Sequence, residues 1–394
     1  MGYIKINQDK VNKEVAEQLK KLCPFNAFEY EDAYLSINAA CKLCKMCVKK
    51  GPLGVCEFVE TRKKTIERTD YQGITVYIQQ KHNKAHPVSW ELVGKALELA
   101  KKTNEEVFAI VIGDDVTKIA EEALEYGVNK VFVYQDKAFR EFNTELYTNV
   151  IERFYEEYQV NVILFGGTAE GRSFAPKVAA RLRTGLTADC TVLDIKENGD
   201  LIQIRPAFGG NIMAKIITPN NRPQMATIRY KMFDAPKKIA PIGKIINKEI
   251  KNISLETKIK IINEKRFQEA KDISDAEVII ACGRGFKKEK DLELIEPLVN
   301  RLNAEIACTR PLIEKGWFDA KKQIGLSGRT VKPKIIINLG ISGSVQYIEG
   351  MKDSELIISI NKDLNNKLFD ISHYAIQADI YEIIPRINQV LENI

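Results

Sequence analysis

The sequence predicts an α/β protein in which two parallel-sheet domains follow a small cysteine-rich domain. Three observations predict this order. Five of the eight cysteines lie within the first sixty residues. From Gly73 onward, strand-like and helix-like segments alternate, and a second alternating region follows a lysine-rich segment. Parallel strands joined by helices produce this alternation and place helices on both faces of each sheet.

The composition sets limits on the function. The 394 residues are 45% apolar and 28% charged, which is typical of a globular chain of two to three domains. No apolar run approaches the roughly 18–20 residues that span a bilayer, so we expect no membrane span. The charged N-terminus lacks the apolar core of a signal peptide, which favours a cytoplasmic location.

The net charge of +6 comes largely from residues 231–271, which contain eleven Lys and Arg against five Asp and Glu. This excess has no interleaved aromatic residues and no recognised binding motif, so we expect no nucleic-acid partner. The segment instead has the composition of a linker.

We expect three domains, over residues 1–66, 67–255 and 256–394. In the middle domain the expected strands span 74–80, 107–113, 130–136 and 160–167, and the expected helices 90–103, 117–127, 144–158 and 171–185. Hairpin strands follow at 191–206 and 213–219. Beyond the linker, strands are expected at 276–285, 334–342, 355–363 and 373–379, with a closing helix at 380–393.

The cysteines predict a metal centre in the first domain. Residues 41–47, CKLCKMC, place three thiols at C-x2-C-x2-C spacing, which lets a short loop turn them toward one iron–sulfur cubane. Zinc is an alternative, but zinc sites usually pair two C-x2-C units and the chain has no second pair. A coincidental cysteine-rich loop is the third reading.

The same region resembles a two-cluster bacterial ferredoxin that retains the ligands of one cluster. Gly51-Pro52 stands where such a ferredoxin has Cys-Pro, and Cys23-Pro24 matches the tail of the other ligand run. The resemblance implies one [4Fe-4S] cluster, with Cys56 as the alternative fourth ligand. The metal ligands that we expect are Cys23, Cys41, Cys44 and Cys47.

Four lysines surround this motif: Lys42, Lys45, Lys49 and Lys50. They could offset the negative charge of a thiolate-bound cluster or attract an acidic electron carrier. A solvated run of charges is an equally good reading.

In the last domain, glycine and small hydroxyl residues gather after the predicted strands, where open α/β sheets bind ligands. The loops are Gly283-Arg284-Gly285, Thr309-Arg310, residues 323–330, residues 340–351, residues 361–363 and residues 377–379. Residues 340–351 turn from a strand into a helix, whose first amides suit a phosphate. None of these loops is a full G-x-G-x-x-G fingerprint.

In this order, the loops resemble the FAD domain of the alpha subunit of electron-transfer flavoproteins. Residues 166–191 and 205–229 resemble the first domain of the same family, so the resemblance covers about residues 73–394. With its N-terminal cysteine motif, the chain is most similar to alpha subunits of electron-bifurcating complexes. Because the motif provides for a single cluster, the chain looks most like the alpha subunits that pair with an anaerobic lactate dehydrogenase. The implied fold class is α/β: two Rossmann-like parallel-sheet domains after a small α+β ferredoxin-like iron–sulfur domain.

The resemblance also implies which residues bind FAD. Arg284 and Thr309 would contact the flavin nucleotide, and Arg310 would lie against the isoalloxazine as a permanent cation. The remaining positions are the ring-edge residues Ile324, Gly325, Leu326 and Ser327, the ribityl-phosphate residues Ser342, Gly343, Ser344, Val345 and Gln346, and the adenosine-side residues Asn361, Asp379 and Ile380.

Two positions depart from the family pattern. The family commonly has Gln where this chain has Leu326, and His where it has Tyr347. A phenol can donate one hydrogen bond to the flavin but carries no positive charge. The resemblance still places Tyr347 among the cofactor-binding residues.

The resemblance implies an electron carrier without a complete catalytic site of its own. A beta subunit with its own FAD and an NAD site would split the electron pair of NADH. One electron would go to ferredoxin, and the other would pass through this chain to a flavin dehydrogenase such as lactate dehydrogenase. The alternatives are a non-bifurcating flavoprotein that serves an acyl-CoA dehydrogenase, and a nucleotide-binding assembly subunit with a structural cluster.

Two further features favour structural roles. GGTAEGRS (166–173) is close to a phosphate-binding P-loop but has Arg172 in place of its lysine, so we expect a helix start there and no ATP. Cys190, Cys282 and Cys308 lie in apolar surroundings, which predicts buried thiols.

Overall fold

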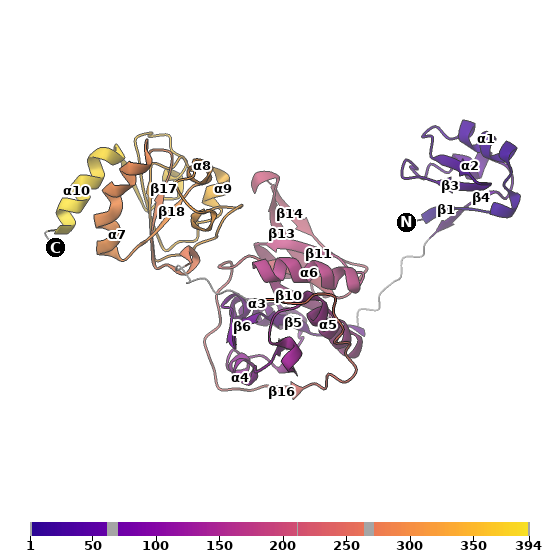
Figure 1. The fold of residues 1–394 in the computed structure, drawn as a ribbon, viewed down its shortest axis with the longest axis horizontal. Coiled ribbons are helices and arrows are strands. Elements are labelled where there is room, and N and C mark those ends of the chain that lie inside the picture. Colours follow the sequence, from indigo (N-terminus) through magenta and orange to yellow (C-terminus); the bar gives the residue numbers. More distant parts are fainter. Residues whose placement is uncertain (1, 61–69, 211, 264–271, 393–394) are drawn as a thin grey trace. The chain divides into compact units, whose positions relative to one another are not determined.

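The computed structural model describes residues 2–60, 70–210, 212–263 and 272–392. The chain divides into two compact units, Met1–Ile66 and Glu67–Ile394. The smaller unit carries the N-terminus, and the larger one holds two parallel sheets (Figure 1).

The smaller unit is an α+β domain. Its strand β1 (Gly2–Ile6) pairs antiparallel with β4 (Cys56–Glu60), and β2 (Phe28–Glu31) pairs with β3 (Tyr34–Ile37). Helix α1 (Lys13–Leu22) starts at Asn12, whose side chain accepts the amide proton of Val15, and α2 (Met46–Lys50) follows the cysteine motif. Its apolar core consists of Ala16, Leu19, Phe28, Leu35, Val55 and Cys56.

The larger unit begins with a seven-stranded sheet in the order β11-β15-β10-β5-β8-β9-β16, parallel throughout. Its strands are β5 (Ile74–Ile78), β8 (Val107–Gly113), β9 (Lys130–Gln135), β10 (Val162–Gly166), β11 (Leu186–Cys190), β15 (Gln224–Ile228) and β16 (Lys244–Asn247). The four predicted strands are confirmed. The predictions omitted β11 and β15, which each carry polar side chains among their apolar ones.

Helices cover both faces of this sheet, as predicted. One apolar cluster joins it to α3 (Val88–Thr103) and α4 (Thr117–Glu125), and another joins it to α5 (Thr144–Tyr158) and α6 (Ala169–Arg181). Helix α6 begins at the near P-loop, where the Thr168 hydroxyl accepts the amide proton of Gly171. The motif therefore caps a helix, as expected.

Shorter elements complete this region. The hairpin strands form an antiparallel sheet of β12 (Val192–Ile195), β13 (Leu201–Ala207) and β14 (Ile212–Ile216). A two-stranded ribbon consists of β6 (Gln80–Lys81) and β7 (Lys84–Ala85). Short 3-10 helices span Gln8–Lys10, Lys137–Phe139, Phe208–Gly210, Ile273–Asp275, Glu289–Ile295, Ala320–Lys322 and Phe369–Ile371.

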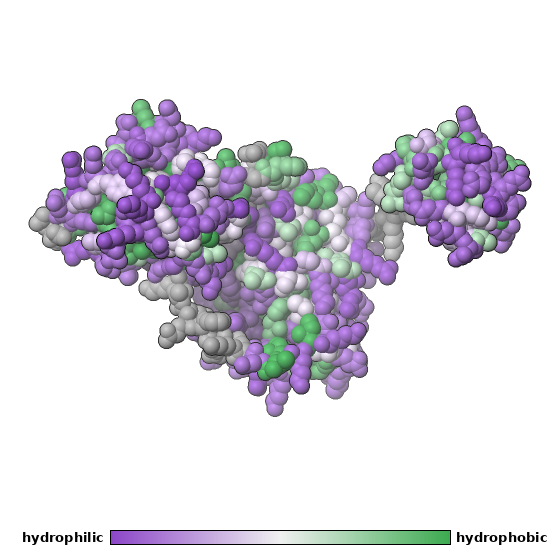
Figure 2. All heavy atoms as spheres, turned by 45° about the horizontal axis from the view of Figure 1, so that its top comes forward, coloured by the Kyte–Doolittle hydropathy of each residue, from purple (hydrophilic) through white to green (hydrophobic). Residues whose placement is uncertain are grey.

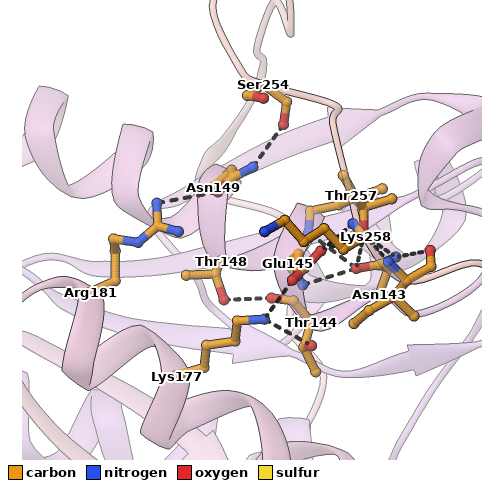
Figure 3. Close-up of polar contacts among 12 residues, drawn as sticks. Asn143, Thr144, Glu145, Thr148, Asn149, Lys177, Arg181, Ser254, Thr257 and Lys258 are labelled. Carbon is orange, nitrogen blue, oxygen red and sulfur yellow. Dashed lines mark hydrogen bonds and ion pairs between the residues drawn. The ribbon is translucent and has the colours of Figure 1, made fainter.

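The prediction that residues 231–271 form a linker is wrong for residues 244–247, and its last part, residues 264–271, lies outside the described residues. Strand β16 pairs parallel with β9, because its sequence KIIN supplies two apolar side chains that pack on the sheet. The chain after β16 is bound along α5 (Figure 3). There, Glu145 accepts the Lys258 amide proton at 2.8 Å and the Thr257 hydroxyl proton at 2.7 Å, and these bonds lower the pKa of Glu145.

The last region is a five-stranded parallel sheet in the order β18-β17-β19-β20-β21. Its elements are β17 (Val278–Cys282), α7 (Glu296–Leu302), β18 (Glu305–Cys308), α8 (Arg310–Glu314), β19 (Ile335–Leu339), α9 (Val345–Ile348), β20 (Leu356–Asn361), β21 (Tyr374–Gln377) and α10 (Ile380–Glu392). The four predicted strands and the closing helix are confirmed, and β18 is an additional strand. Cys190, Cys282 and Cys308 are fully buried, as predicted.

The surface is mainly hydrophilic in the view of Figure 2, with apolar side chains in small separate groups. The most exposed large apolar residues are Leu53, at 98%, and Ile262, at 92%. Among the described residues, no helix is long and apolar enough to cross a membrane.

Candidate cofactor sites

A cavity of about 570 Å³ lies along the carboxyl ends of the five-stranded sheet. Strand β17 comes first in the chain, yet β18 and β19 flank it on opposite sides. The loops after β17 and β19 therefore leave the sheet in different directions and open a crevice, which is where open α/β sheets bind ligands. The volume is within the usual range for a small-molecule site.

Two glycines let the crevice loops cross closely. A Cβ atom on Gly285 would lie 2.6 Å from the Gly340 Cα, and a Cβ on Gly340 would lie equally close to Gly285. Gly340 also has φ +62°, a conformation that other residues rarely adopt. The backbone of the cavity floor thus requires glycine at both positions.

Two side-chain amides hold the next loop in place. The side chains of Asn361 and Asn366 both donate to the Ile341 carbonyl, at 2.9 and 2.7 Å. Ser344 caps α9 by accepting the Tyr347 amide proton at 3.4 Å. This arrangement fixes the backbone from Ile341 to Ser344 beside the cavity.

Tyr347 lines the cavity but directs its proton elsewhere. Its hydroxyl donates to the Asn338 side-chain oxygen at 2.5 Å, and both residues are buried. Burial holds the pKa of Tyr347 well above its usual value, so the phenol is neutral. In this arrangement the phenol proton is not available to a ligand.

The predicted FAD residues fall into two groups. Eight of them line the cavity: Arg284, Thr309, Ser342, Ser344, Tyr347, Asn361, Asp379 and Ile380. The others lie outside its lining: Arg310, Ile324, Gly325, Leu326, Ser327, Gly343, Val345 and Gln346. Among these, Arg310 is exposed, and its guanidinium bonds Glu314 one helical turn later at 2.9 Å.

Residues 324–327 nevertheless form an ordered turn against α9. The Leu326 amide donates to the Gln346 carbonyl at 2.9 Å, and Arg229 donates to the Leu326 carbonyl at 3.1 Å. Gln323 donates to the Ser327 hydroxyl oxygen at 2.8 Å, which leaves that hydroxyl proton free for another acceptor.

Four residues that line the cavity lie outside the loops that the sequence singled out: Lys287, Pro311, Asn366 and Tyr381. Six more lie in those loops but were given no role: Gly285, Gly340, Ile341, Lys362, Asp363 and Ala378. The position of Tyr381 next to Ile380, and that of Lys287 shortly after a predicted strand, were the available signals.

In the smaller unit, a narrow cavity of about 20 Å³ is lined by all four predicted metal ligands, Cys23, Cys41, Cys44 and Cys47. Cys56 is not part of this lining and belongs to the apolar core behind Cys47. Burial raises the pKa of the Cys47 thiol and that of the Cys56 thiol, the latter to about 12.

The thiols of these cysteines are not arranged as the ligands of a single metal ion. Across the residues that the structure describes, no group of three or more His, Cys, Asp or Glu side chains is arranged to bind one metal ion. A tetrahedral zinc site would bring its sulfurs to about 3.8 Å from one another, given a Zn–S distance of about 2.3 Å. The arrangement therefore lacks a preformed zinc site.

Gly51 ends α2 and is tightly enclosed. A Cβ atom there would lie 2.2 Å from the Cys47 carbonyl oxygen and 3.0 Å from Leu19. This backbone leaves no room for a side chain at residue 51.

Comparison with known proteins identifies the larger unit. The Electron transfer flavoprotein domain family matches residues 74–257, and the Electron transfer flavoprotein FAD-binding domain family matches residues 272–352. The chain is 38% identical over 332 residues to the electron transfer flavoprotein subunit alpha of Megasphaera elsdenii, which covers 83% of this chain and 98% of the relative. The chain belongs to the alpha-subunit family of electron transfer flavoproteins. This membership confirms the resemblance seen in the sequence.

Two other relatives differ in how much of the chain they match. Protein FixB of Clostridium saccharobutylicum is 40% identical over 81% of this chain and 96% of its own length. Subunit LctC of the lactate dehydrogenase (NAD(+),ferredoxin) of Acetobacterium woodii is 50% identical over 393 residues, which is 100% of this chain and 94% of the relative. The similarity to LctC therefore includes the cysteine-rich unit.

The FAD-binding domain match supports FAD as a cofactor of this chain. The cavity suits an extended dinucleotide, because it has the volume of a small-molecule site and the cations Arg284, Lys287 and Lys362 line it. When bound, FAD would supply the electron-accepting chemistry, and the chain would supply its position and surroundings.

Proposed function

We propose that this chain is an electron-bifurcating electron transfer flavoprotein alpha subunit of the lactate dehydrogenase type, with one FAD and one [4Fe-4S] cluster. It passes electrons between a beta subunit, which has its own FAD and NAD site, and a lactate dehydrogenase. Its place is the cytoplasm of an anaerobe. The observation that carries this proposal is the full-length similarity to LctC, whose name joins lactate dehydrogenase with NAD(+) and ferredoxin.

The N-terminal unit separates this proposal from an ordinary electron carrier. The other relatives reported above cover 81% and 83% of the chain, and the uncovered share has about the length of the N-terminal unit. A carrier that only links a beta subunit to a dehydrogenase has no need of a further domain. The additional unit therefore serves a second electron route.

One observation supports the cluster in this unit. The four cysteines of the expected ligand set line one cavity, and the candidate Cys56 does not. The enclosed Gly51 leaves no room for a further ligand there, which favours a single cluster. In this proposal Cys23, Cys41, Cys44 and Cys47 each bind one iron, and the unit is a single-cluster relative of ferredoxins.

The FAD is held at the five-stranded sheet. Arg284 and Thr309 contact the flavin nucleotide, the loop from Ser342 to Gln346 holds the ribityl-phosphate part, and Asn361, Asp379 and Ile380 hold the adenosine side. Residues 324–327 flank the edge of the flavin ring, where the free hydroxyl proton of Ser327 is available to the ring. Arg310 leaves its ion pair with Glu314 and contacts the flavin instead. The cavity lining supports the places of Arg284, Thr309, Ser342, Ser344, Asn361, Asp379 and Ile380, and the two asparagine bonds to Ile341 hold the loop beside them. The residues outside the lining are assigned from the family resemblance alone.

The lysines beside the cysteine motif suit an acidic carrier such as ferredoxin. Lys42, Lys49 and Lys50 are exposed, whereas the Lys45 ammonium lies 3.6 Å from the Phe58 ring centroid. Exposed charges of one sign speed the encounter with an oppositely charged partner. The proposed second route thus runs from the cluster to ferredoxin.

The test is anaerobic co-expression of the chain with its beta subunit and its flavin dehydrogenase. The purified complex should couple lactate oxidation to NAD⁺ reduction only when reduced ferredoxin is present. Activity with an acyl-CoA substrate in place of lactate would contradict the proposal. NAD⁺ reduction at the same rate with and without reduced ferredoxin would also contradict it. The second outcome would indicate the non-bifurcating alternative.

A further inference from the structure

One end of the FAD cavity carries an aromatic residue and a cation that the sequence did not predict. Tyr381, in the first turn of α10, and Lys287, in the loop after β17, both line the cavity. The Lys287 ammonium lies 5.3 Å from the Tyr381 ring centroid, within the range of a cation–π contact. Two segments far apart in the chain thus meet at this end.

Hydrogen bonds fix the pair. The Lys287 amide donates to the Tyr381 hydroxyl oxygen at 2.7 Å, and the hydroxyl donates to an Asp291 carboxylate oxygen at 2.5 Å. The same carboxylate oxygen also accepts the Lys288 amide proton at 2.9 Å. Together these bonds lower the pKa of Asp291, so it stays ionised and keeps the loop closed on α10.

The Lys287 ammonium has no carboxylate partner among the residues that the structure describes. The two carboxylates in the cavity lining each accept a backbone amide proton rather than pairing with Lys287. Asp379 accepts the Tyr381 amide proton at 2.9 Å, and Asp363 accepts the Asn365 amide proton at 3.0 Å. Lys287 therefore presents its ammonium at this end of the cavity without a direct ion pair.

This end lies opposite the flavin end. Tyr347 packs in the apolar cluster on one face of the sheet, together with Ile324. Tyr381 packs against the cluster on the other face, together with Ile380. Because the cavity passes over the carboxyl edge from one face to the other, a dinucleotide with its flavin near Tyr347 has its adenylate half near Tyr381.

We propose that Lys287, positioned by Tyr381, recognises the adenylate half of FAD through the adenosine-side phosphate. The pair is a specificity determinant for FAD over FMN, which has the flavin, the ribityl chain and a single phosphate but no adenylate. The proposal rests on the FAD assignment of this chain and is independent of the cluster, of the dehydrogenase partner and of bifurcation.

The test measures FAD and FMN affinity separately. Flavin is stripped from the full chain, and each ligand is titrated back while its fluorescence is followed. Lys287→Gln should raise the Kd for FAD about tenfold, the size of one charge-assisted hydrogen bond, and leave the Kd for FMN unchanged. Lys287→Arg should restore FAD binding to within about threefold, because the charge returns.

Two more variants complete the design. Tyr381→Phe keeps the ring but removes the hydroxyl that holds the loop, so it should weaken FAD binding and spare FMN. Lys290→Gln is the matched control, because Lys290 is exposed three residues away and does not line the cavity. An equal loss for FAD and FMN, no loss in Lys287→Gln, or the same loss in Lys290→Gln would each overturn the proposal.

Discussion

The hydroxyl of Tyr347 offers a sharp test of how the chain surrounds its flavin. Tyr347→Phe removes this hydroxyl and leaves the ring in place. In the structure the hydroxyl donates its proton to Asn338 at 2.5 Å, and the two residues are 3% and 1% exposed. The Asn338 amide in turn donates to the Ser359 hydroxyl at 3.2 Å, so the asparagine cannot easily turn away.

The expected cost follows from this geometry. The phenylalanine variant leaves the Asn338 oxygen buried without a donor, which costs about 1–3 kcal/mol of folding stability. The flavin loses no donor, because the phenol proton already belongs to Asn338. The reduction potential of this FAD should therefore shift by less than about 30 mV. That is about half of the shift that corresponds to a tenfold change in the equilibrium constant of a one-electron couple.

The chain has two tryptophans, which allows a selective assay. In a Trp90→Phe background, the fluorescence of Trp317 reports urea unfolding of the region around the five-stranded sheet, against whose core it packs. Spectroelectrochemical titration of the FAD-loaded chain gives the potential. A shift of about 60 mV or more without loss of stability would show that the phenol donates to the flavin, and the reasoning would fail.

Four other results are expected. Tyr347→His should raise the first reduction potential of this FAD, because an imidazole can become a cation; an unchanged titration would exclude contact with the flavin. Cys23→Ala should abolish the iron content and the electron paramagnetic resonance signal of the reduced protein, whereas Cys56→Ala should keep both; the reverse pattern would make Cys56 the fourth ligand. Gly285→Ala should lower FAD affinity at least tenfold, since its Cβ would lie 2.6 Å from the facing loop, and normal flavin retention would contradict the crossing geometry. Burial raises the pKa of Glu91 from 4.5 to about 7, so the folded chain binds a proton that the unfolded chain has released. Stability from this group should fall as the pH rises from about 4.5 to about 7, and Glu91→Gln should stabilise the chain at about pH 8 but not at about pH 5 in urea unfolding.

Much of the fold could be predicted, because regular periodicity is a local property. Strands such as residues 107–113 are apolar throughout, and helices such as residues 144–158 repeat their apolar residues every three to four positions. Strand β16 escaped prediction because four residues in a lysine-rich segment give too little pattern. Its place follows from pairing with β9, which is a property of the assembled sheet.

The candidate site was predictable to the extent that loops follow strands. Arg284, Thr309 and Asp379 line the cavity because each lies within two residues of the end of a strand of the same sheet. The pairing of Lys287 with Tyr381 joins residues ninety-four positions apart, which no local pattern can reveal. The bond between Arg310 and Glu314 did have a local signal, since the residues are four apart on a helix.

Cofactor analysis tests the central claim most directly. The chain should be purified under anoxic conditions together with its beta subunit, and the iron and flavin of the pair should be counted. The account predicts one cluster's full complement of iron and two FAD molecules for each pair, with the iron lost in Cys23→Ala. A preparation without iron that contains a single flavin would contradict it.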